Sequence, residues 1–464
     1  MPRPAGLLAV ALAVAASGAA ACARPAPAPR LLLLISVDTL RADHLGAYGS
    51  ERGLTPRLDA LARESLVFRA AYAPAPFTLP SMAALFSGRY PETLGVVSNA
   101  SRLPPVPTLA SELAARGWRT GAVVGNLALR RPAGLAAGFE LYDDALPQRE
   151  AVRGWPERVA AATTDAALAM LDRLGGGDGR ALVWVHYVDP HGPYTPPAGL
   201  RERYLAEEAL RFDAKRELTP GTGEPGSLPA YQYLEGRRDL AFYRAGYAGE
   251  IRYVDSEIGR LLDGLGERGL GRDPLVVFTA DHGEALGEGG LWFDHRDLLT
   301  DALVRVPLLV RLPSGEAGPR DDLVSLVDLF PTLLAALEDL PVDGSYPGRD
   351  LLAPGAAAGG SRPYLATLGH GRERRVGLVD AGHKLVVSQG PAGPRISLYR
   401  RGDDDVDVVE RDAPRARALG AELEALRGRL AARPEERQDL RPEEREQLHR
   451  MGYLQGDAPP EPGP

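Results

Sequence analysis

The chain has 464 residues, of which 44% are hydrophobic and 25% charged, and its formal net charge is −8. These values are ordinary for a globular protein, and the length suits one large domain or a large domain with a small partner. The net charge is negative and the sequence contains no basic tract, so we do not expect nucleic acid as the partner.

The first segment has the pattern of an export signal. A basic residue precedes an Ala/Leu/Val run over about residues 5–16, which is too short and too alanine-rich for a membrane-spanning helix. Cys22, the only cysteine, ends the segment and makes it similar to a bacterial lipoprotein signal, although Ala19 stands where leucine is usual. An ordinary signal cut nearby is the alternative. We expect a lipoprotein-type signal peptide over 1–22, lipidation of Cys22, a Pro-rich tether over 23–30, and an exported, membrane-anchored protein in the periplasm or at the cell surface.

Five apolar runs predict buried parallel strands. They are LLLLISV (31–37), TGAVVG (120–125), ALVWVHY (181–187), LVVFTA (275–280) and VPLLVRL (306–312). Helical patterns lie between them, including 56–64, where Thr55 is a plausible cap, and a face of apolar residues from Ile251 to Leu265. This alternation predicts an α/β fold with a doubly wound, mostly parallel sheet over residues 31–352.

The remaining segments predict smaller features. Residues 200–240 are polar and rich in Gly and Pro, which favours a surface excursion beside the site. Short strand patterns and a charged helix over about 413–432 predict a small C-terminal α+β subdomain over 362–455. We expect the acidic, proline-ended tail over 456–464 to be disordered.

The stretch FTLPSMAALFSG (77–88) places the hydroxyl of Thr78 at the start of a predicted helix. Pro80 suits a first helical position, and Gly88 ends the apolar run. Thr78 is therefore either an N-terminal helix cap or a reactive group near the positive end of the helix dipole.

Polar side chains follow four of the predicted strands, where the working site of an open α/β sheet lies. They are Asp38, Asn126, the pair Asp189 and His191, and the pair Asp281 and His282. Each alone is consistent with a loop cap. Together they predict convergence on a divalent cation through carboxylate oxygen and imidazole nitrogen.

These segments resemble the sulfatase family of the alkaline-phosphatase-like superfamily. The matching stretches are ISVDTLRADHLGAYG (35–49), TLPSMAALFSGRYPETLGV (78–96), DPHGPYTPP (189–197), TADHGEALGEGGLWFDH (279–295), RVPLLVRLP (305–313) and SLVDLFPTLL (325–334). The resemblance implies a metal held by Asp38, Asp281 and His282. It places Thr78 at the nucleophile position, with its oxygen as a further ligand. It also implies that His191 and His295 face the anionic group or leaving oxygen of the substrate.

Several positions depart from the family pattern. Family sulfatases have two adjacent aspartates where this chain has Asp38-Thr39, and a Cys or Ser converted to formylglycine where it has Thr78. The arginine of that motif is Met82, and a Gly-Lys-Trp-His element reads Gly-Asn-Leu-Ala from Gly125. Since threonine is not a substrate for the conversion, no formylglycine is expected. Threonine is what the phosphodiesterases, phosphonate hydrolases and headgroup transferases of the superfamily use, and Asn126 resembles the asparagine with which such phosphodiesterases hold a phosphoryl oxygen.

The leading hypothesis is an exported, metal-dependent hydrolase or phosphotransferase of phosphate or phosphonate (di)esters with Thr78 as nucleophile. The alternatives are a sulfuric ester hydrolase that uses unmodified threonine, and an inactive surface receptor for anionic glycans. One divalent ion (Mn, Zn, Ca or Mg) is expected, and the donor set favours Mn or Zn over Ca. A second metal could be held by a group of four side chains: His186, Asp189, His191 and His295. We expect Asn126 and Asp189 to bind the substrate, which would be a small-molecule, glycan or lipid-headgroup anionic ester.

Overall fold

The computed structural model describes residues 29–450, apart from 151–153, 176–178, 212–216, 222–225, 235, 271–273, 296–297, 341–343, 345, 354, 356–362 and 368–372. The expected signal peptide with Cys22, most of the tether and the tail over 456–464 lie outside the described residues. Among the helices described, none has the length and apolar character that a membrane crossing requires.

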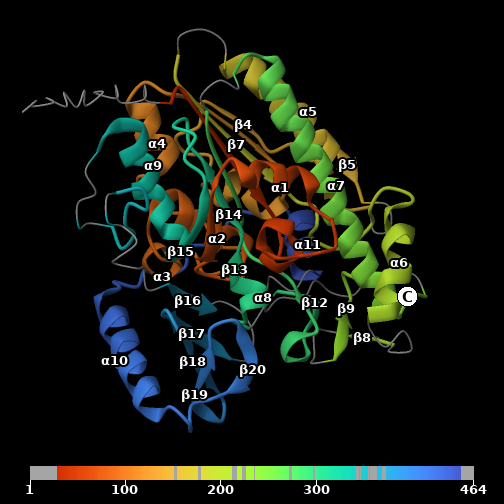
Figure 1. Ribbon diagram of the computed structural model, residues 1–464, viewed down its shortest axis with the longest axis vertical. Helices are drawn as coiled ribbons and strands as arrows, with labels where there is room; N and C mark the ends of the chain where they lie inside the picture. The colour runs from red at the N-terminus through yellow and green to blue at the C-terminus, as the bar shows by residue number, and fades with distance from the viewer. Residues whose placement is uncertain are drawn as a thin grey trace, which may run out of the picture.

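A nine-stranded sheet forms the centre of the larger part of the protein (Figure 1). Its strands in spatial order are β13 (Arg305–Val306), β2 (Leu66–Tyr72), β14 (Leu308–Arg311), β10 (Leu275–Ala280), β1 (Leu31–Val37), β7 (Ala181–Tyr187), β3 (Arg119–Val124) and β4 (Leu141–Asp143), with β15 (Gly318–Ser325) paired to β2. The strands from β10 to β4 run parallel, and β1, β7 and β10 are buried along their whole length. Parallel strands covered on both faces are apolar throughout for this reason. The predicted α/β fold with a mostly parallel sheet is confirmed.

One strand that was predicted to be parallel runs the other way. The run 306–312 contains β14, which pairs antiparallel with β10 and places Leu309 opposite Phe278. A parallel neighbour needs a crossover of a dozen or more residues, usually a helix. The described residues between β10 and β14 instead form the short strands β11 (Ala285–Leu286) and β12 (Trp292–Asp294) and the four-residue helix α8 (Asp301–Val304). The chain therefore turns back beside β10, and the sheet is mixed at this edge.

Two groups of helices cover the sheet (Figure 1). One group is α1 (Pro56–Arg63), α5 (Ala160–Leu174), α6 (Leu200–Arg211) and α7 (Leu240–Glu267); the other is α2 (Thr78–Ser87), α3 (Pro91–Leu94), α4 (Leu109–Ala115) and α9 (Leu329–Glu338). The apolar face predicted from Ile251 onward is buried on α7. The segment expected to be a surface excursion contains α6 and a pair of short strands, β8 (Thr219–Gly221) and β9 (Ser227–Pro229), and it buries Leu228 and Tyr231. It is therefore partly core.

The start of α1 is capped from a distant helix. The side chain of Thr55, the expected cap, makes no capping hydrogen bond. The backbone amides of Arg57 and Leu58 instead donate to the carboxylate of Asp255 on α7, at 3.1 and 2.8 Å. A carboxylate at the positive end of the helix satisfies these donors as a local cap would.

A separate antiparallel sheet follows in the C-terminal region, at the lower left of Figure 1. Its strands lie in chain order: β16 (Tyr364–Thr367), β17 (Arg374–Val379), β18 (His383–Gly390), β19 (Gly393–Arg400) and β20 (Asp403–Asp407). The helix α10 (Ala413–Arg429) packs on it through Leu419 and Leu423. Lys384 of β18 is buried, and its Nζ lies 2.6 Å from Asp301 of α8 and 2.5 Å from Asp404 of β20. This ion triad ties the small sheet to the larger part.

The end of the described chain returns to the larger part. The helix α11 (Pro442–Arg450) places Leu448 in a small apolar cluster with Phe77 and Leu127. The predicted division at residue 362 stays a prediction, but the last described helix packs beside the start of α2 and away from the C-terminal sheet.

Candidate active site

The ends of β1 and β10 place two carboxylates side by side. The register pairs Val37 with Ala280, so that Asp38 and Asp281 follow at the same edge of the sheet. Both side chains are fully buried, and Oδ1 of Asp38 and Oδ2 of Asp281 have no hydrogen-bond donor among the described residues. Buried carboxylate oxygens without a donor are costly unless a cation neutralises them. The pair is therefore suited to a metal ion.

Two imidazoles bring nitrogen atoms to the same place. Nε2 of His282 lies 3.7 Å from Asp38 Oδ1 and 3.6 Å from Asp281 Oδ2. Its Nδ1 lies 2.9 Å from the carbonyl oxygen of Gly283, so Nδ1 carries the proton and the Nε2 lone pair faces the carboxylates. Ligand atoms of Asp38, His186 and Asp281 also lie within 4.8 Å of one another. This mixture of oxygen and nitrogen donors fits a divalent ion.

His186 was expected only at a second metal site, but its ring faces Asp38. Nε2 of His186 is 3.8 Å from Asp38 Oδ2, and Nδ1 is 2.8 Å from Ser36 Oγ, which also accepts from Trp184 Nε1. His186 is the sixth residue of β7, the strand beside β1, and it lies opposite Ser36 in the register of the two strands. It acts either as a ligand or as a donor to Asp38, depending on which ring nitrogen carries the proton.

Thr39 supplies a neutral oxygen where the family has its second aspartate. Its φ of 55° lies in the left-handed region, which is rare for a β-branched residue and is stabilised here by the surrounding structure. The Thr39 backbone N–H donates to Asp281 Oδ1 at 3.2 Å, and its buried hydroxyl has no hydrogen-bond partner among the described residues. The site thus has one negative charge fewer but keeps an oxygen at this position.

Thr78 lies inside this cluster and does not cap its helix. The helix α2 begins at Thr78 itself, the N-cap is Phe77, and Pro80 is at the third helical position, not at the first as predicted. Thr78 Oγ1 is 3.5 Å from His282 Nε2. The Ser81 hydroxyl donates to the carbonyl oxygen of Asp281 at 2.6 Å, which fixes the first turn of α2 to the end of β10. The hydroxyl is therefore held at a helix N-terminus beside the carboxylates.

The two expected substrate-binding residues lie in different surroundings. The Asn126 amide donates to Asp38 Oδ2, and its oxygen accepts from the Ala128 N–H at 2.7 Å, so Asn126 orients Asp38. Asp189 is paired with Glu250 of α7. Burial is the main cause that raises the pKa of Asp189 to about 6. The structure brings Asn126, and not Asp189, into contact with the Asp38 cluster.

His191 and His295 complete the wall next to His282. The ring centroid of His295 is 4.5 Å from that of His282 and 5.2 Å from that of His191. Nδ1 of His295 is 3.5 Å from Glu284 Oε1, and Glu284 Oε2 accepts from the Tyr194 hydroxyl at 2.9 Å. Burial alone would lower the pKa of His295, but the buried Glu284 carboxylate outweighs it and raises that pKa. The Glu284 carboxylate thus favours the protonated form of His295.

The pKa shifts of Asp38, Asp281 and His282 show that the buried carboxylates repel each other and that His282 is not charged. Burial, and then the charge of Asp38, raises the pKa of Asp281 well above its usual range. Burial also acts to raise the pKa of Asp38, but the nearby imidazoles of His191, His186 and His282 outweigh it, so that this pKa is lowered. Burial lowers the pKa of His282 to about 3, so its imidazole is neutral. A bound cation would relieve the repulsion between the carboxylates.

The arginine closest in sequence to Asp38 is already engaged. Arg41 is buried, and its guanidinium contacts Asp43 at 2.6 Å, Glu288 at 2.7 Å and the Glu284 carbonyl oxygen at 3.1 Å. Met82, at the position of the family's arginine, is buried in α2. Neither of these two positions thus supplies a free guanidinium group to the site.

Known proteins are similar to this chain in sequence and in fold. The sequence matches the Sulfatase family over residues 30–340. It is 26% identical over 347 residues to an ulvan-active sulfatase of Formosa agariphila, covering 69% of this chain and 64% of that protein. It is 31% identical over 339 residues to human arylsulfatase A, covering 67% of this chain and 64% of that protein. The chain therefore spans about 64% of the length of either relative.

Solved structures show the same fold. A protein in complex with its substrate D-glucosamine-2-N,6-O-disulfate superimposes with a TM-score of 0.70 at 17% identity, over 87% of this chain and 98% of that one. The phosphonate monoester hydrolase of Agrobacterium radiobacter gives a TM-score of 0.65 at 22% identity, over 87% and 96%. The match over two thirds of the sequence, together with the shared fold, shows that the chain belongs to the sulfatase family.

Proposed function

We propose that this chain is a metal-dependent ester hydrolase in which Thr78 is the nucleophile and phosphate or phosphonate (di)esters are the substrates. The observation that carries the proposal is the position of Thr78 Oγ1, 3.5 Å from His282 Nε2 at the start of α2. A hydroxyl with no role in helix capping, held among buried carboxylates and imidazoles, has the surroundings of an activated nucleophile.

The residues present fit a divalent cation. Asp38, Asp281 and His282 would hold it together with the Thr78 oxygen, and His186 is placed to join them or to orient Asp38. The oxygen atoms of Asp38 and Asp281 that lack donors are the observation that supports this fit. When bound, such an ion would acidify the Thr78 hydroxyl and offset the negative charge of the ester.

The side chains of the site support a two-step displacement. The Thr78 hydroxyl gives up its proton to solvent, and its oxygen forms a bond to phosphorus while the bond to the leaving alcohol breaks. The positive end of α2 favours the anion that develops. His295, whose protonated form the nearby Glu284 carboxylate favours, would give its proton to the leaving oxygen. Water then attacks the phosphothreonine and releases the phosphate. An acceptor alcohol in place of water would give a headgroup transferase.

The nucleophile favours phosphorus over sulfur. Formylglycine sulfatases release sulfate by elimination from a hydrated aldehyde, a route that a sulfothreonine does not have. Two side chains that could stabilise a sulfuryl transition state do not do so among the described residues, since Met82 replaces an arginine and Arg41 is engaged with acidic groups. Hydrolysis of sulfuric esters by unmodified Thr78 is the second candidate, because the sequence relatives named above are sulfatases.

A panel of esters with one common aryl leaving group tests the proposal: a phosphate monoester, a phosphodiester, a phosphonate and a sulfate. We expect kcat/KM for one of the phosphorus esters to exceed that for the sulfate at least about tenfold, and Thr78→Ala to lower turnover about 10³-fold or more with metal content retained. Thr78→Ser, which keeps the hydroxyl, is the matched control and should retain turnover. Mass spectrometry of quenched reactions should find phosphate on Thr78. Wild-type rates for Thr78→Ala would remove this residue from the mechanism, and a faster sulfate ester would favour the second candidate.

We also propose that the protein is exported and anchored by a lipid on Cys22. The support is the N-terminal pattern of a basic residue, an apolar run and a single cysteine. Labelling with a radioactive fatty acid and membrane fractionation should find the wild type acylated and sedimenting with membranes. Cys22→Ser should be unlabelled, and equal labelling of the two would contradict the anchor.

A further inference from the structure

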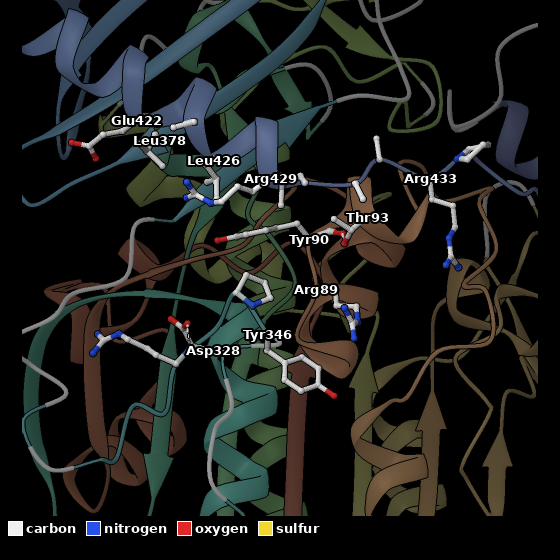
Figure 2. A pocket seen from close by; sticks show the side chains of 18 residues that line it. Arg89, Tyr90, Thr93, Asp328, Tyr346, Leu378, Glu422, Leu426, Arg429 and Arg433 are labelled. Carbon is white, nitrogen blue, oxygen red and sulfur yellow. Dashed lines mark hydrogen bonds between the residues drawn. The ribbon is translucent and has the colours of Figure 1, made fainter.

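A cavity of about 1070 Å³ lies where the far end of α2 meets the C-terminal subdomain (Figure 2). We call it the border cavity. Arg89 and Tyr90, which directly follow the end of α2, form one wall, and Leu426 and Arg429 of α10 form the opposite wall. Arg433, in the segment after α10, lies at one side in Figure 2. The volume is at the upper limit of what a drug-sized ligand occupies.

Arginine dominates the charged lining of the border cavity. The charged lining residues are Arg89, Arg349, Arg429 and Arg433, against Asp328 and Glu422. The side chains of Arg89, Arg429 and Arg433 have no carboxylate partner among the residues that the structure describes. The chain as a whole has a net charge of −8, so a local excess of unpaired guanidinium groups runs against its overall balance. Such an excess favours an anionic ligand.

The surface between these arginines is apolar. Tyr90 and Leu378 are buried beneath it, and Leu426 and Leu430 of the C-terminal part are half-buried at its edge. The Arg89 guanidinium lies 5.1 Å from the ring centroid of Tyr346, a cation–π contact that holds one arginine against the wall. A ligand in this cavity would thus meet apolar surface along its body and cations at several points around it.

We propose that the border cavity is a second binding site, which takes a segment of an oligosaccharide bearing several anionic groups. Guanidinium groups bind sulfate, phosphate and carboxylate through paired hydrogen bonds, and arginines on different walls call for anions at more than one position of the ligand. The C–H faces of sugar rings match the apolar floor, and the volume suits more than one ring.

This site is distinct from the catalytic one. Thr78 begins α2 and Arg89 follows its end, and ten helical residues span about 15 Å. The border cavity would therefore hold a charged glycan away from the ester that is cleaved. Its occupancy does not depend on which ester Thr78 attacks.

Calorimetry on the full chain tests the proposal with four probes: sulfated dextran oligomers, oligogalacturonate, neutral dextran oligomers and inorganic polyphosphate. We expect at least one anionic saccharide to bind at least tenfold more tightly than neutral dextran. The triple variant Arg89→Ala/Arg429→Ala/Arg433→Ala should weaken that binding at least tenfold without changing turnover of a small aryl ester. Arg417→Ala, an exposed arginine of α10 outside the cavity, is the matched control and should bind as the wild type does.

The outcomes separate this site from the catalytic one. Thr78→Ala should keep the saccharide binding, whatever its effect on turnover, so that failure of either proposal can be seen alone. Wild-type binding by the triple variant would overturn the border cavity as the site. Equal binding of neutral dextran, or tighter binding of polyphosphate than of any saccharide, would overturn the class of ligand. The single variant Arg429→Glu, on an exposed side chain, provides a second test if the triple variant is unstable.

Discussion

The two ends of α2 carry opposite kinds of uncompensated charge. At its start, the carboxylates of Asp38 and Asp281 are fully buried and include oxygen atoms without donors. At its other end, Arg89, Arg429 and Arg433 are partly or fully exposed and have no carboxylate partners among the described residues. Buried charge is costly and demands a tightly held counter-ion, whereas exposed charge costs little and is screened by salt. The affinity for the metal at the first end should therefore change little with salt concentration. The affinity for the anionic saccharide at the second end should fall as salt is added.

The largest expected effect comes from removing one of the buried charges. Asp281→Asn should lower metal affinity at least about 100-fold, since loss of a metal ligand should cost more than loss of a residue that only orients one, and should abolish turnover. It should also raise the melting temperature in the presence of a chelator, because the repulsion between Asp38 and Asp281 is gone. Metal analysis and thermal denaturation measure both effects. A metal-free variant less stable than the metal-free wild type would contradict the charge argument.

The next effect concerns the ion triad that ties the C-terminal sheet to the larger part of the protein. Lys384→Met leaves Asp301 and Asp404 facing each other without the buried ammonium, which should lower the free energy of unfolding by about 3–5 kcal/mol. Urea denaturation measures this, with Arg400→Met on the exposed face of β19 as the control. Saccharide binding should weaken while metal affinity stays unchanged. Equal losses in both would show that the two ends of α2 are not independent.

A smaller effect is expected at the proton donor. Glu284→Gln keeps the shape of the side chain but removes the charge that favours protonated His295, and should lower kcat about 10- to 100-fold. The loss should be larger for an alkyl than for an aryl leaving group, because a poor leaving group needs the proton more. An equal loss for both would assign Glu284 a purely structural role.

The smallest effect is a pH dependence of the free energy of unfolding that comes from the acidic residues Asp189, Glu157 and Glu250. Burial and the nearby carboxylates raise the pKa of Asp189 to about 6 and that of Glu157 to about 7, and they raise the pKa of Glu250 well above its usual range. The folded state then binds more protons than the unfolded chain, so their contribution to stability is present at about pH 4 and is lost as the pH rises to about 7. Glu250→Gln should raise the free energy of unfolding at pH 8 and change it little at pH 4.

Denaturation of the metal-loaded protein from pH 4 to 8 checks this sign. Glu267→Gln, at the exposed end of the same helix, should follow the wild type throughout. A Glu250→Gln variant that is less stable than the wild type at pH 8 would contradict the direction.

The sequence predicted the groups that directly follow strands. Asp38, Asp281 and His282 could be placed because parallel strands bring their carboxyl ends to one edge, and the structure has them there. His186 could not be placed by the same rule, because it lies inside a fully buried strand, where the direction of a ring depends on the neighbouring strand. Glu284 lies in a loop whose path sets its distance to His295. The direction of β14 depends on a connection that carries no crossover helix among its described residues.

The border cavity had no sequence signal at all. Its lining comes from segments near residues 89, 346, 378 and 429, which are far apart in the sequence, and the arginines of 427–433 alone do not indicate a cavity. Sites made by the docking of two folded parts depend on how those parts meet, and local patterns do not encode that.

The pairing of β1 also constrains how the protein is made. This strand needs β7 on one side and β10 on the other. The contact of Ser36 with His186 spans 150 residues, and that of Thr39, just after the strand, with Asp281 spans 242. Contacts of such long range slow folding, and until residue 280 has been synthesised the run LLLLISV lacks a neighbour and is prone to aggregate. Fragments that end before β10 should therefore remain unfolded, and the catalytic centre can assemble only when most of the larger part has left the ribosome.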